Sequence, residues 1–452
     1  MNSIIVAVIV AAFGFAATRQ LFDPAAGSVM QALSKTIVDD AGQAVTLAFG
    51  LIGVLALFLG VMKVAEAAGL LRLLARLLRR PMQRLFPQVP ADHPAMGSMI
   101  LNIAANILGL GNAATPFGLK AMQALDQLNP RKGEATDAMV LFMAINTASV
   151  TVLPTSVIAL RAAAGSTDPA GITLTTLFAT TCSTIVAVVA AKLGQRYWPG
   201  PVTPTTKTRP MTGHSAEVAG GGGMPLDVKP PAPVRSSPSF SAVPDSWRDD
   251  QSAAPTWVSV LFLLGFAATF PLLFAYGQQI GGWLLPTLIA AFVVYGACRR
   301  VAVYEALVEG AREGFDVAVR ILPYLVIILV AIGMLRASGA LPALLGFFSP
   351  LTTALGIPVE AVLMAILRTL SGSGAFAYLA SVINDPAIGP DSYTGYLVST
   401  IQGSTETTFY VLAVYCGAAG VRRIRYALVA GLAADATGFA AAVLICRLLY
   451  GG

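Results

Sequence analysis

The chain has too few histidines and cysteines to build the common catalytic and metal sites of enzymes. Its 452 residues include two histidines and four cysteines, and the cysteines stand singly, without the spacing of zinc ligands. This scarcity of histidine disfavours a Ser-His-Asp hydrolase, and the sequence contains no Walker-type phosphate loop. We therefore expect no enzyme, no metal site and no cofactor.

Charged residues are also scarce. Only 12% of the residues are charged, 56% are hydrophobic, and the mean hydropathy is +0.72. A soluble domain carries about 25% charged residues, so the composition predicts an all-α polytopic membrane protein, whose helices satisfy their own backbone hydrogen bonds in lipid. The net charge is +6, and the basic residues cluster beside apolar segments. This placement is typical of residues that set the orientation of membrane spans and contact lipid headgroups, and it does not indicate nucleic-acid binding.

A segment rich in Pro, Gly and Ser divides the chain into two apolar halves, residues 1–196 and 255–452. Its composition predicts that residues 197–254 form a disordered cytoplasmic linker. Runs long enough to cross about 30 Å of hydrocarbon predict spans at 2–18, 42–63, 136–160, 172–194, 256–276, 281–298, 317–336, 396–417 and 426–449. We expect 2–18 to be a retained helix and not a signal peptide, because no Lys or Arg precedes it.

The two halves share the order of their features, which predicts an internal repeat. In each half a Leu/Val-rich span precedes a glycine-interrupted segment (96–126 or 358–384), a polar-centred span and a closing span. Glycine and proline are the residues expected to break these helices. The predicted breaks lie at Gly109, Gly111, Pro116 and Pro154 in the first half and at Gly372 and Gly374 in the second.

Basic residues fix the orientation of the two copies. Arginines between positions 72 and 84 follow the first opening span, and Arg422, Arg423 and Arg425 precede the second closing span. The positive-inside rule places both clusters in the cytoplasm. Spans 256–276 and 281–298 then cross out and back. Both basic clusters lie on the cytoplasmic side only if the two interrupted segments are re-entrant hairpins and the two copies have opposite orientations. Inverted copies with interrupted helices are the architecture of secondary transporters.

Leucines and arginines alternate at helical spacing along residues 70–86. This pattern predicts an amphipathic helix lying in the membrane interface.

Polar side chains gather at the interrupted segments and at the centres of the spans that follow them. A carboxylate in an apolar segment is costly, so Glu406 is expected to face a cavity or a partner. Backbone groups freed at helix breaks can hold ions or polar solutes. The candidate solute- or ion-binding residues are Asn102, Asn106, Asn112, Thr115, Asn146, Thr147, Ser149, Thr151, Ser371, Ser373, Gln402, Ser404, Thr405, Glu406, Thr407 and Thr408.

Only the second copy brings a titratable group to these positions, since Val150 aligns with Glu406. We predict proton or cation coupling there, with Arg368 as the partner of Glu406 and Asp435 as a further intramembrane carboxylate. Two alternatives stay open. Glu406 can be a structural residue, protonated or paired with an arginine, and the asparagines can be packing contacts between helices.

Two acids, Asp385 and Asp391, flank prolines in a predicted external loop. Acids in such a loop are interpreted as solvated.

Longer motifs resemble a known family. Residues 106–122 resemble the signature of spore maturation protein A, whereas residues 371–374, 389–392 and 402–415 resemble spore maturation protein B. Both belong to the family carrying the nucleoside-recognition or Gate domain, also found in concentrative nucleoside transporters and ferrous-iron permeases. The resemblance covers nearly all of the chain outside 200–255. It implies a fused bacterial inner-membrane protein with transporter-like halves, linked in spore-formers to dehydration of the spore core.

Two functions follow from these features. The first is a transporter or permease of a small polar solute, nucleoside-like or an ion, driven by a proton or cation gradient. The second is a non-transporting maturation or scaffold factor that binds a partner or lipid. The expected partners are the lipid bilayer and the solute or ion, and long apolar surfaces are compatible with a homodimer.

Overall fold

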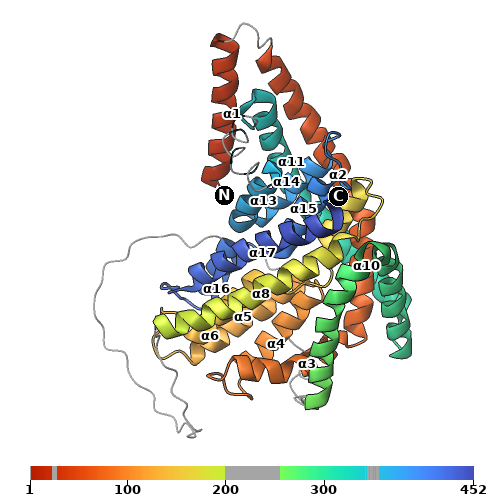
Figure 1. Cartoon of the computed structure of the whole chain (residues 1–452), viewed down its shortest axis with the longest axis vertical. Helices are drawn as coiled ribbons and strands as arrows, with labels where there is room; N and C mark the ends of the chain where they lie inside the picture. Colours follow the sequence, from red (N-terminus) through yellow and green to blue (C-terminus); the bar gives the residue numbers. More distant parts are fainter. Residues whose placement is uncertain are drawn as a thin grey trace.

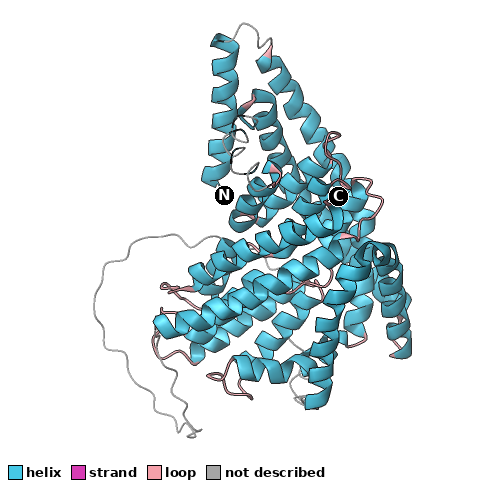
Figure 2. Ribbon diagram, in the orientation of Figure 1, coloured by secondary structure: helices cyan, strands magenta, loops and turns pink. Residues whose placement is uncertain are grey.

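The computed structural model describes residues 2–22, 28–198, 255–341 and 356–451, with four single positions between the last two ranges. These residues form helices and no strand (Figure 2), which confirms the all-α fold class. Within them, α2 (Val29–Ala67), α8 (Ile172–Tyr197), α11 (Val303–Ser338) and α17 (Ala427–Tyr450) are long and apolar enough to cross a membrane. Of the predicted linker, residues 199–254 lie outside the described residues.

The helices follow the predicted order of features in each half (Figure 1). After α1 (Asn2–Phe22) and α2, the first half contains α3 (Leu70–Leu85), α4 (Pro94–Ile107), α5 (Gly111–Gln127), α6 (Asp137–Ala148), α7 (Thr155–Ala163) and α8. The second half contains α10 (Thr256–Cys298), α11, α13 (Val359–Leu370), α14 (Gly372–Ile383), α15 (Tyr393–Ser404), α16 (Thr408–Ala418) and α17.

The closing helices of the two halves, α8 and α17, lie side by side and run in opposite directions (Figure 1). At one end the Tyr450 hydroxyl donates to the carbonyl oxygen of Gly171. At the other end, a Cβ added to Gly194 would meet the ring of Tyr426. One residue number rises along the pair as the other falls, so these equivalent helices are antiparallel.

The opening helices α2 and α11 repeat this arrangement. Gly60 packs against Leu307 near one end of the pair, and Asp40 packs against Gly333 near the other. Gly310 brings the backbones together, since a Cβ there would lie 2.3 Å from the carbonyl oxygen of Leu59. Because both pairs of equivalent helices are antiparallel, the predicted inverted repeat is confirmed.

The amphipathic segment forms α3, and part of its apolar face is buried in the protein. Leu71, Leu74 and Met82 are buried in clusters built with residues of the neighbouring helices. The helix packs these residues against the α4 region of the protein, whereas Leu73 is exposed; its position in the membrane interface stays a prediction.

The two spans predicted at 256–276 and 281–298 are one continuous helix of 43 residues, α10. No turn separates them, although Pro271 and Pro286 lie within the helix. The intervening glycines and glutamines lower helix propensity by at most about 1 kcal/mol each, and that cost does not force a break. The predicted out-and-back crossing was therefore wrong for this segment.

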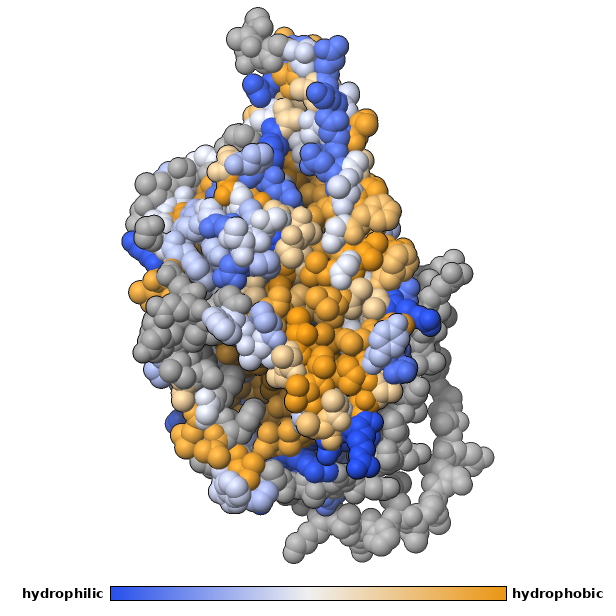
Figure 3. Space-filling view, turned by 90° about the vertical axis from the view of Figure 1, so that its right-hand side faces the viewer, coloured by the Kyte–Doolittle hydropathy of each residue, from blue (hydrophilic) through white to orange (hydrophobic). Residues whose placement is uncertain are grey.

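An apolar belt crosses the middle of the face seen in Figure 3, and hydrophilic residues gather above and below it. Large side chains such as Ile185, Val189 and Leu444 are among the exposed hydrophobic residues. Such a belt suits contact with hydrocarbon better than contact with water.

Candidate functional site

The turn between α4 and α5 packs on an interrupted helix of the same half. Gly109 has φ +76° and lies so close to this break that a Cβ would be 2.3 Å from the carbonyl oxygen of Leu153. The amide of Val152 donates to the carbonyl oxygen of Ile107 at 2.9 Å. Backbone groups freed by the interruption are thus partly satisfied by the hairpin.

The second half repeats this contact between the turn of α13 and α14 and the interruption after α15. A Cβ on Gly372 would lie 2.8 Å from the Thr407 hydroxyl oxygen. Arg368 Nε donates to the carbonyl oxygen of Thr405 at 2.6 Å. Ser371 lies at the turn itself, where its hydroxyl accepts from the amide of Gly374 at 3.0 Å and caps α14.

Two spans predicted as continuous, 136–160 and 396–417, are therefore interrupted. Residues 149–154 separate α6 from α7, and residues 405–407 separate α15 from α16. Pro154, at the start of α7, lies at a break as predicted. Pro116 and Gly374 do not, since Pro116 lies inside α5 and Gly374 in the first turn of α14.

The two interrupted helices meet each other. The amide of Glu406, in the second break, donates to the carbonyl oxygen of Thr147 at the end of α6, at 2.7 Å. Both copies therefore contribute backbone to one crossing point, with a hairpin turn packed on each break.

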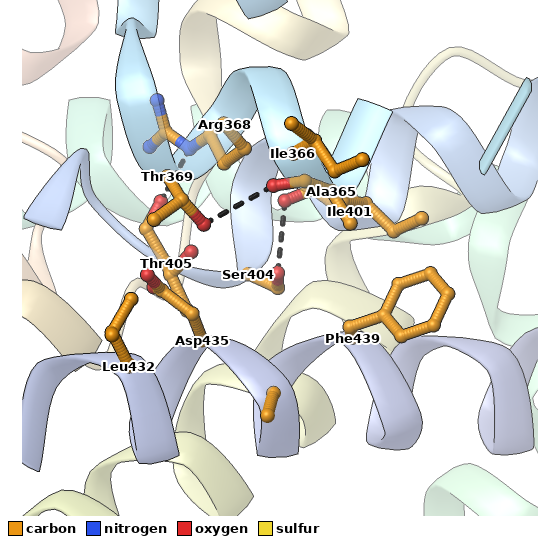
Figure 4. Close-up of a pocket in the computed structure, with 11 residues that line it drawn as sticks. Ala365, Ile366, Arg368, Thr369, Ile401, Ser404, Thr405, Leu432, Asp435 and Phe439 are labelled. Carbon is orange, nitrogen blue, oxygen red and sulfur yellow. Dashed lines mark hydrogen bonds between the residues drawn. The ribbon is translucent and has the colours of Figure 1, made fainter. Parts of the chain in front are cut away.

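A cavity of about 260 Å³ opens beside the second break (Figure 4). We call it the break cavity. Its walls come from α13, from the end of α15 with Thr405, and from α17. Its lining residues are Ala365, Ile366, Arg368, Thr369, Ile401, Ser404, Thr405, Leu432, Asp435, Ala436 and Phe439.

Asp435 brings a carboxylate to this cavity from the middle of α17. Its Oδ2 accepts a hydrogen bond of 2.7 Å from the hydroxyl of Thr408, the first residue of α16. Its Oδ1 is buried and has no hydrogen-bond partner among the described residues. A buried carboxylate oxygen without a partner is costly, so this atom is a strong candidate for contacting a ligand.

The side chain of Glu406 is 54% exposed and does not line the break cavity. Its carboxylate oxygen lies 3.5 Å from Arg368 Nη2, as predicted for this pair. Glu406 was expected to face a cavity or a partner, and it meets the partner named for it, Arg368. A role of Glu406 in binding a solute or coupling ion stays a prediction.

The asparagines of the first half form a buried network. The side-chain amide of Asn106 donates to Asn146 Oδ1 at 3.1 Å, and the Tyr415 hydroxyl donates to the same oxygen at 3.0 Å. The amide of Asn102 donates to the Tyr415 hydroxyl oxygen at 3.3 Å. Tyr415 was missed because an isolated tyrosine in an apolar helix resembles ordinary packing. The network ties α4 and α6 to α16 of the other half.

Several predicted residues have local roles. The hydroxyls of Thr147, Ser149 and Thr151 donate to nearby backbone carbonyls. Ser373 is exposed, Thr115 is half-buried, and the side chain of Asn112 lies outside the described side chains.

Two predicted residues stand close to the break cavity. Gln402 and Thr407 are buried, and Gln402 Oε1 has no hydrogen-bond partner among the described residues. Thr369, whose hydroxyl donates to the carbonyl oxygen of Ala365 (Figure 4), was missed because it lies before the glycine pair that marked the hairpin.

At one end of α8 and α17, a fully buried arginine joins the two halves. Arg161 Nη2 lies 3.0 Å from Asp391 Oδ1, and the guanidinium lies 4.2 Å from the centre of the Tyr396 ring. Asp391 also accepts from the amide and hydroxyl of Thr167 at 2.7 and 2.8 Å. We call Arg161, Asp391 and Tyr396 the Arg161 clamp.

Asp391 and Asp385, interpreted from the sequence as solvated loop acids, are partly exposed, and each also forms an ion pair with an arginine. Asp385 pairs with Arg336 at 3.3 Å. Burial raises the pKa of Asp391, but hydrogen bonds from Ser166 and Thr167 and the charge of Arg161 outweigh burial and hold this pKa below its usual range.

The opposite end of the pair carries a matching group. Arg425 Nη1 lies 2.7 Å from Asp137 Oδ1, the Tyr426 hydroxyl donates to the same oxygen at 2.9 Å, and the guanidinium lies 4.9 Å from the Tyr426 ring centre. We call these three residues the Arg425 clamp. Each clamp joins an arginine of one half to an aspartate of the other.

Comparisons with known proteins agree with this two-part architecture. A family model described as Gate, nucleoside recognition, matches residues 48–164 and 318–422. Spore maturation protein B of Bacillus subtilis (strain 168) is 44% identical over 178 residues, which cover 38% of this chain and 99% of the relative. Spore maturation protein A of the same organism is 44% identical over 160 residues, which cover 35% of this chain and 82% of the relative.

No solved structure matches the chain. The two relatives match different parts of it, as expected for a fusion. The chain therefore belongs to the Gate-domain family of membrane proteins that includes spore maturation proteins A and B, and it joins a relative of each in one polypeptide.

Proposed function

We propose that this membrane protein transports a small polar solute and that the break cavity binds it. The observation that carries the proposal is a cavity beside an interrupted helix, where Asp435 and Arg368 meet hydroxyl groups in an otherwise apolar wall. Secondary transporters place their substrate sites at discontinuous helices between inverted repeats. The relation to the nucleoside-recognition family supports the same class of function.

The chemistry of the walls narrows the kind of solute. Arg368 offers hydrogen-bond donors, Asp435 offers an acceptor, and the hydroxyls of Thr369, Ser404 and Thr405 serve as either. Ile401, Leu432 and Phe439 add apolar surface. A compact solute with donors, acceptors and one apolar face, such as a nucleoside or a small organic acid, suits this lining.

A thermal-shift screen of the purified full chain tests the proposal. Nucleosides, organic acids and metal ions are added at two pH values, and a ligand is expected to raise the melting temperature of the wild type. Asp435→Asn should remove the shift. Asp92→Asn, which makes the same chemical change at a side chain that is 89% exposed, should keep it.

Uptake of the hit into proteoliposomes then separates transport from binding alone. Asp435→Asn should abolish uptake, and Glu406→Gln should preserve most of it because Glu406 does not line the cavity. A protein that binds no solute in the screen and carries none into vesicles would favour the scaffold function instead.

A further inference from the structure

Asp435 lies where a charge needs compensation. It is the ninth residue of α17, among alanines and a glycine, well inside a helix long and apolar enough to cross the membrane. A carboxylate at such a depth is expensive unless a proton, a cation or hydrogen bonds compensate it. Thr408 satisfies only Oδ2, and Oδ1 remains buried without a partner in the described part of the chain.

The arginine in the same cavity forms its ion pair with another carboxylate. Arg368 donates from Nε to the carbonyl oxygen of Thr405 at 2.6 Å and pairs through Nη2 with Glu406 at 3.5 Å. No Lys or Arg of the described residues forms an ion pair with Asp435. The guanidinium thus forms its ion pair with Glu406, and the charge of the Asp435 carboxylate has no ion-pair partner among the described residues.

Oxygen atoms gather around this charge. The hydroxyls of Thr369, Ser404 and Thr405 line the cavity with Asp435 (Figure 4). α15 ends at Ser404, so its last carbonyl groups lack helical donors and carry the negative end of the helix dipole. A carboxylate, hydroxyls and a helix C-terminus in one place attract a hard cation that prefers oxygen ligands.

From this arrangement we infer that the Asp435 corner of the break cavity binds a sodium ion. One carboxylate matches a monovalent charge, whereas Ca²⁺ sites usually gather several carboxylates. The described residues contain no cluster of three His, Cys, Asp or Glu side chains that would hold a transition metal. The inference extends the proposed function by naming the coupling ion. Sodium binding at Asp435 does not depend on transport, whereas a coupling role for the ion rests on the proposed function.

Among the side chains that the structure describes, the first half offers no second site of this kind. The ninth residue of α8 is Thr180, the positional equivalent of Asp435, and its hydroxyl donates to the carbonyl oxygen of Leu177 at 3.1 Å. Beside the first break the asparagines bond to one another and to Tyr415. We therefore expect one ion per chain.

Sodium binding is measured on the purified full chain without any solute. The melting temperature is followed while NaCl replaces choline chloride at constant ionic strength, and parallel titrations use KCl. The wild type should be stabilised by Na⁺ in a saturable manner, and more than by K⁺. Asp435→Asn should abolish the response, and Asp92→Asn should leave it intact.

A second variant keeps the test informative if Asp435→Asn fails to fold. Thr405→Val retains the carboxylate and removes one oxygen, so the midpoint of the Na⁺ titration should rise about tenfold, as expected for one lost oxygen contact. Equal stabilisation in NaCl and choline chloride would overturn the inference. Stabilisation by low pH alone, with no dependence on Na⁺, would also overturn it and assign Asp435 to a proton.

These outcomes are distinguishable from failure of the proposed function. A chain that transports a solute but ignores Na⁺ would keep the transport proposal and refute the ion. A chain that binds Na⁺ at Asp435 but carries no solute would support the sodium site and refute the transport proposal.

Discussion

Arg161 is the largest fully buried side chain in the described part of the molecule, and its ion pair among the described residues is with Asp391. Replacing Asp391 by Asn removes this ion pair and leaves Asp168 as the remaining carboxylate that acts on the guanidinium. Removing one member of a fully buried ion pair typically costs about 3 kcal/mol. Asp391 is partly exposed, so the free energy of unfolding should fall by a smaller amount, about 1–2 kcal/mol. Denaturant titration in mixed micelles measures it, with Asp92→Asn as the control. A loss below about 0.5 kcal/mol would contradict the clamp.

The same pair predicts a pH dependence. The pKa of Asp391 is lowered in the folded protein, relative to about 3.9 in an unfolded chain. Its contribution to stability is therefore complete above about pH 4 and is lost as the pH falls below that value through the lower folded pKa. The stability difference between wild type and Asp391→Asn should be constant from about pH 5 to 7 and shrink below about pH 4 in thermal melts.

At this scale the sequence identified polar residues better than their partners. Asn102, Asn106 and Asn146 were singled out, and the structure joins them. Glu406 was favoured over Asp435 because it stands among five hydroxyl and amide residues. Periodicity cannot show that an extended break turns Glu406 to the outside while α17 carries Asp435 into the cavity.

Among the elements, the α4–α5 hairpin gives the sharpest prediction. Gly109 combines a positive φ with a close approach to the carbonyl oxygen of Leu153. Gly109→Ala should lower the free energy of unfolding by about 2 kcal/mol or more, since the left-handed conformation alone costs about 1–2 kcal/mol. Gly97→Ala is the matched control: nothing lies within 4 Å of its added Cβ, and helix propensity favours alanine by about 1 kcal/mol.

Denaturant titration measures the change in the free energy of unfolding for both variants. A decrease for Gly109→Ala together with an increase for Gly97→Ala would support a hairpin turn fixed against the break. Equal, small effects would mean that the turn is not held against Leu153.

The hairpins could be predicted because glycine pairs interrupt apolar runs locally. The interruptions at 149–154 and 405–407 could not, because their backbone groups are satisfied by distant partners. Glu406 donates to Thr147, and Val152 donates to Ile107. These hydrogen bonds exist only once the two halves have packed, so no local pattern announces where the helices end.

Over the whole molecule, the inverted repeat places basic loops at one end of α8 and α17 and acidic loops at the other end. The amides of Arg422 and Arg423 donate to the carbonyl oxygen of Gly133 at one end. Arg425 also donates to the carbonyl oxygen of Trp198, the last described residue before position 255. Acidic loops with Asp168 and Asp391 meet at the other end. From the positive-inside rule we predict that the basic end faces the cytoplasm.

This orientation predicts where two new cysteines can be labelled. Gln127, at the end of α5, and Ala387, between α14 and α15, are both exposed and uncharged. The labelling background lacks Cys182 and Cys298, the less buried of the four natural cysteines. A membrane-impermeant maleimide is added to cells whose outer layer is permeabilised and whose inner membrane is intact. It should label Ala387→Cys. Gln127→Cys should react only after the inner membrane is opened, because a re-entrant hairpin returns α5 to the basic side. Labelling of both from the same side would contradict the inverted crossing, and with it the placement of the break cavity between two oppositely oriented copies.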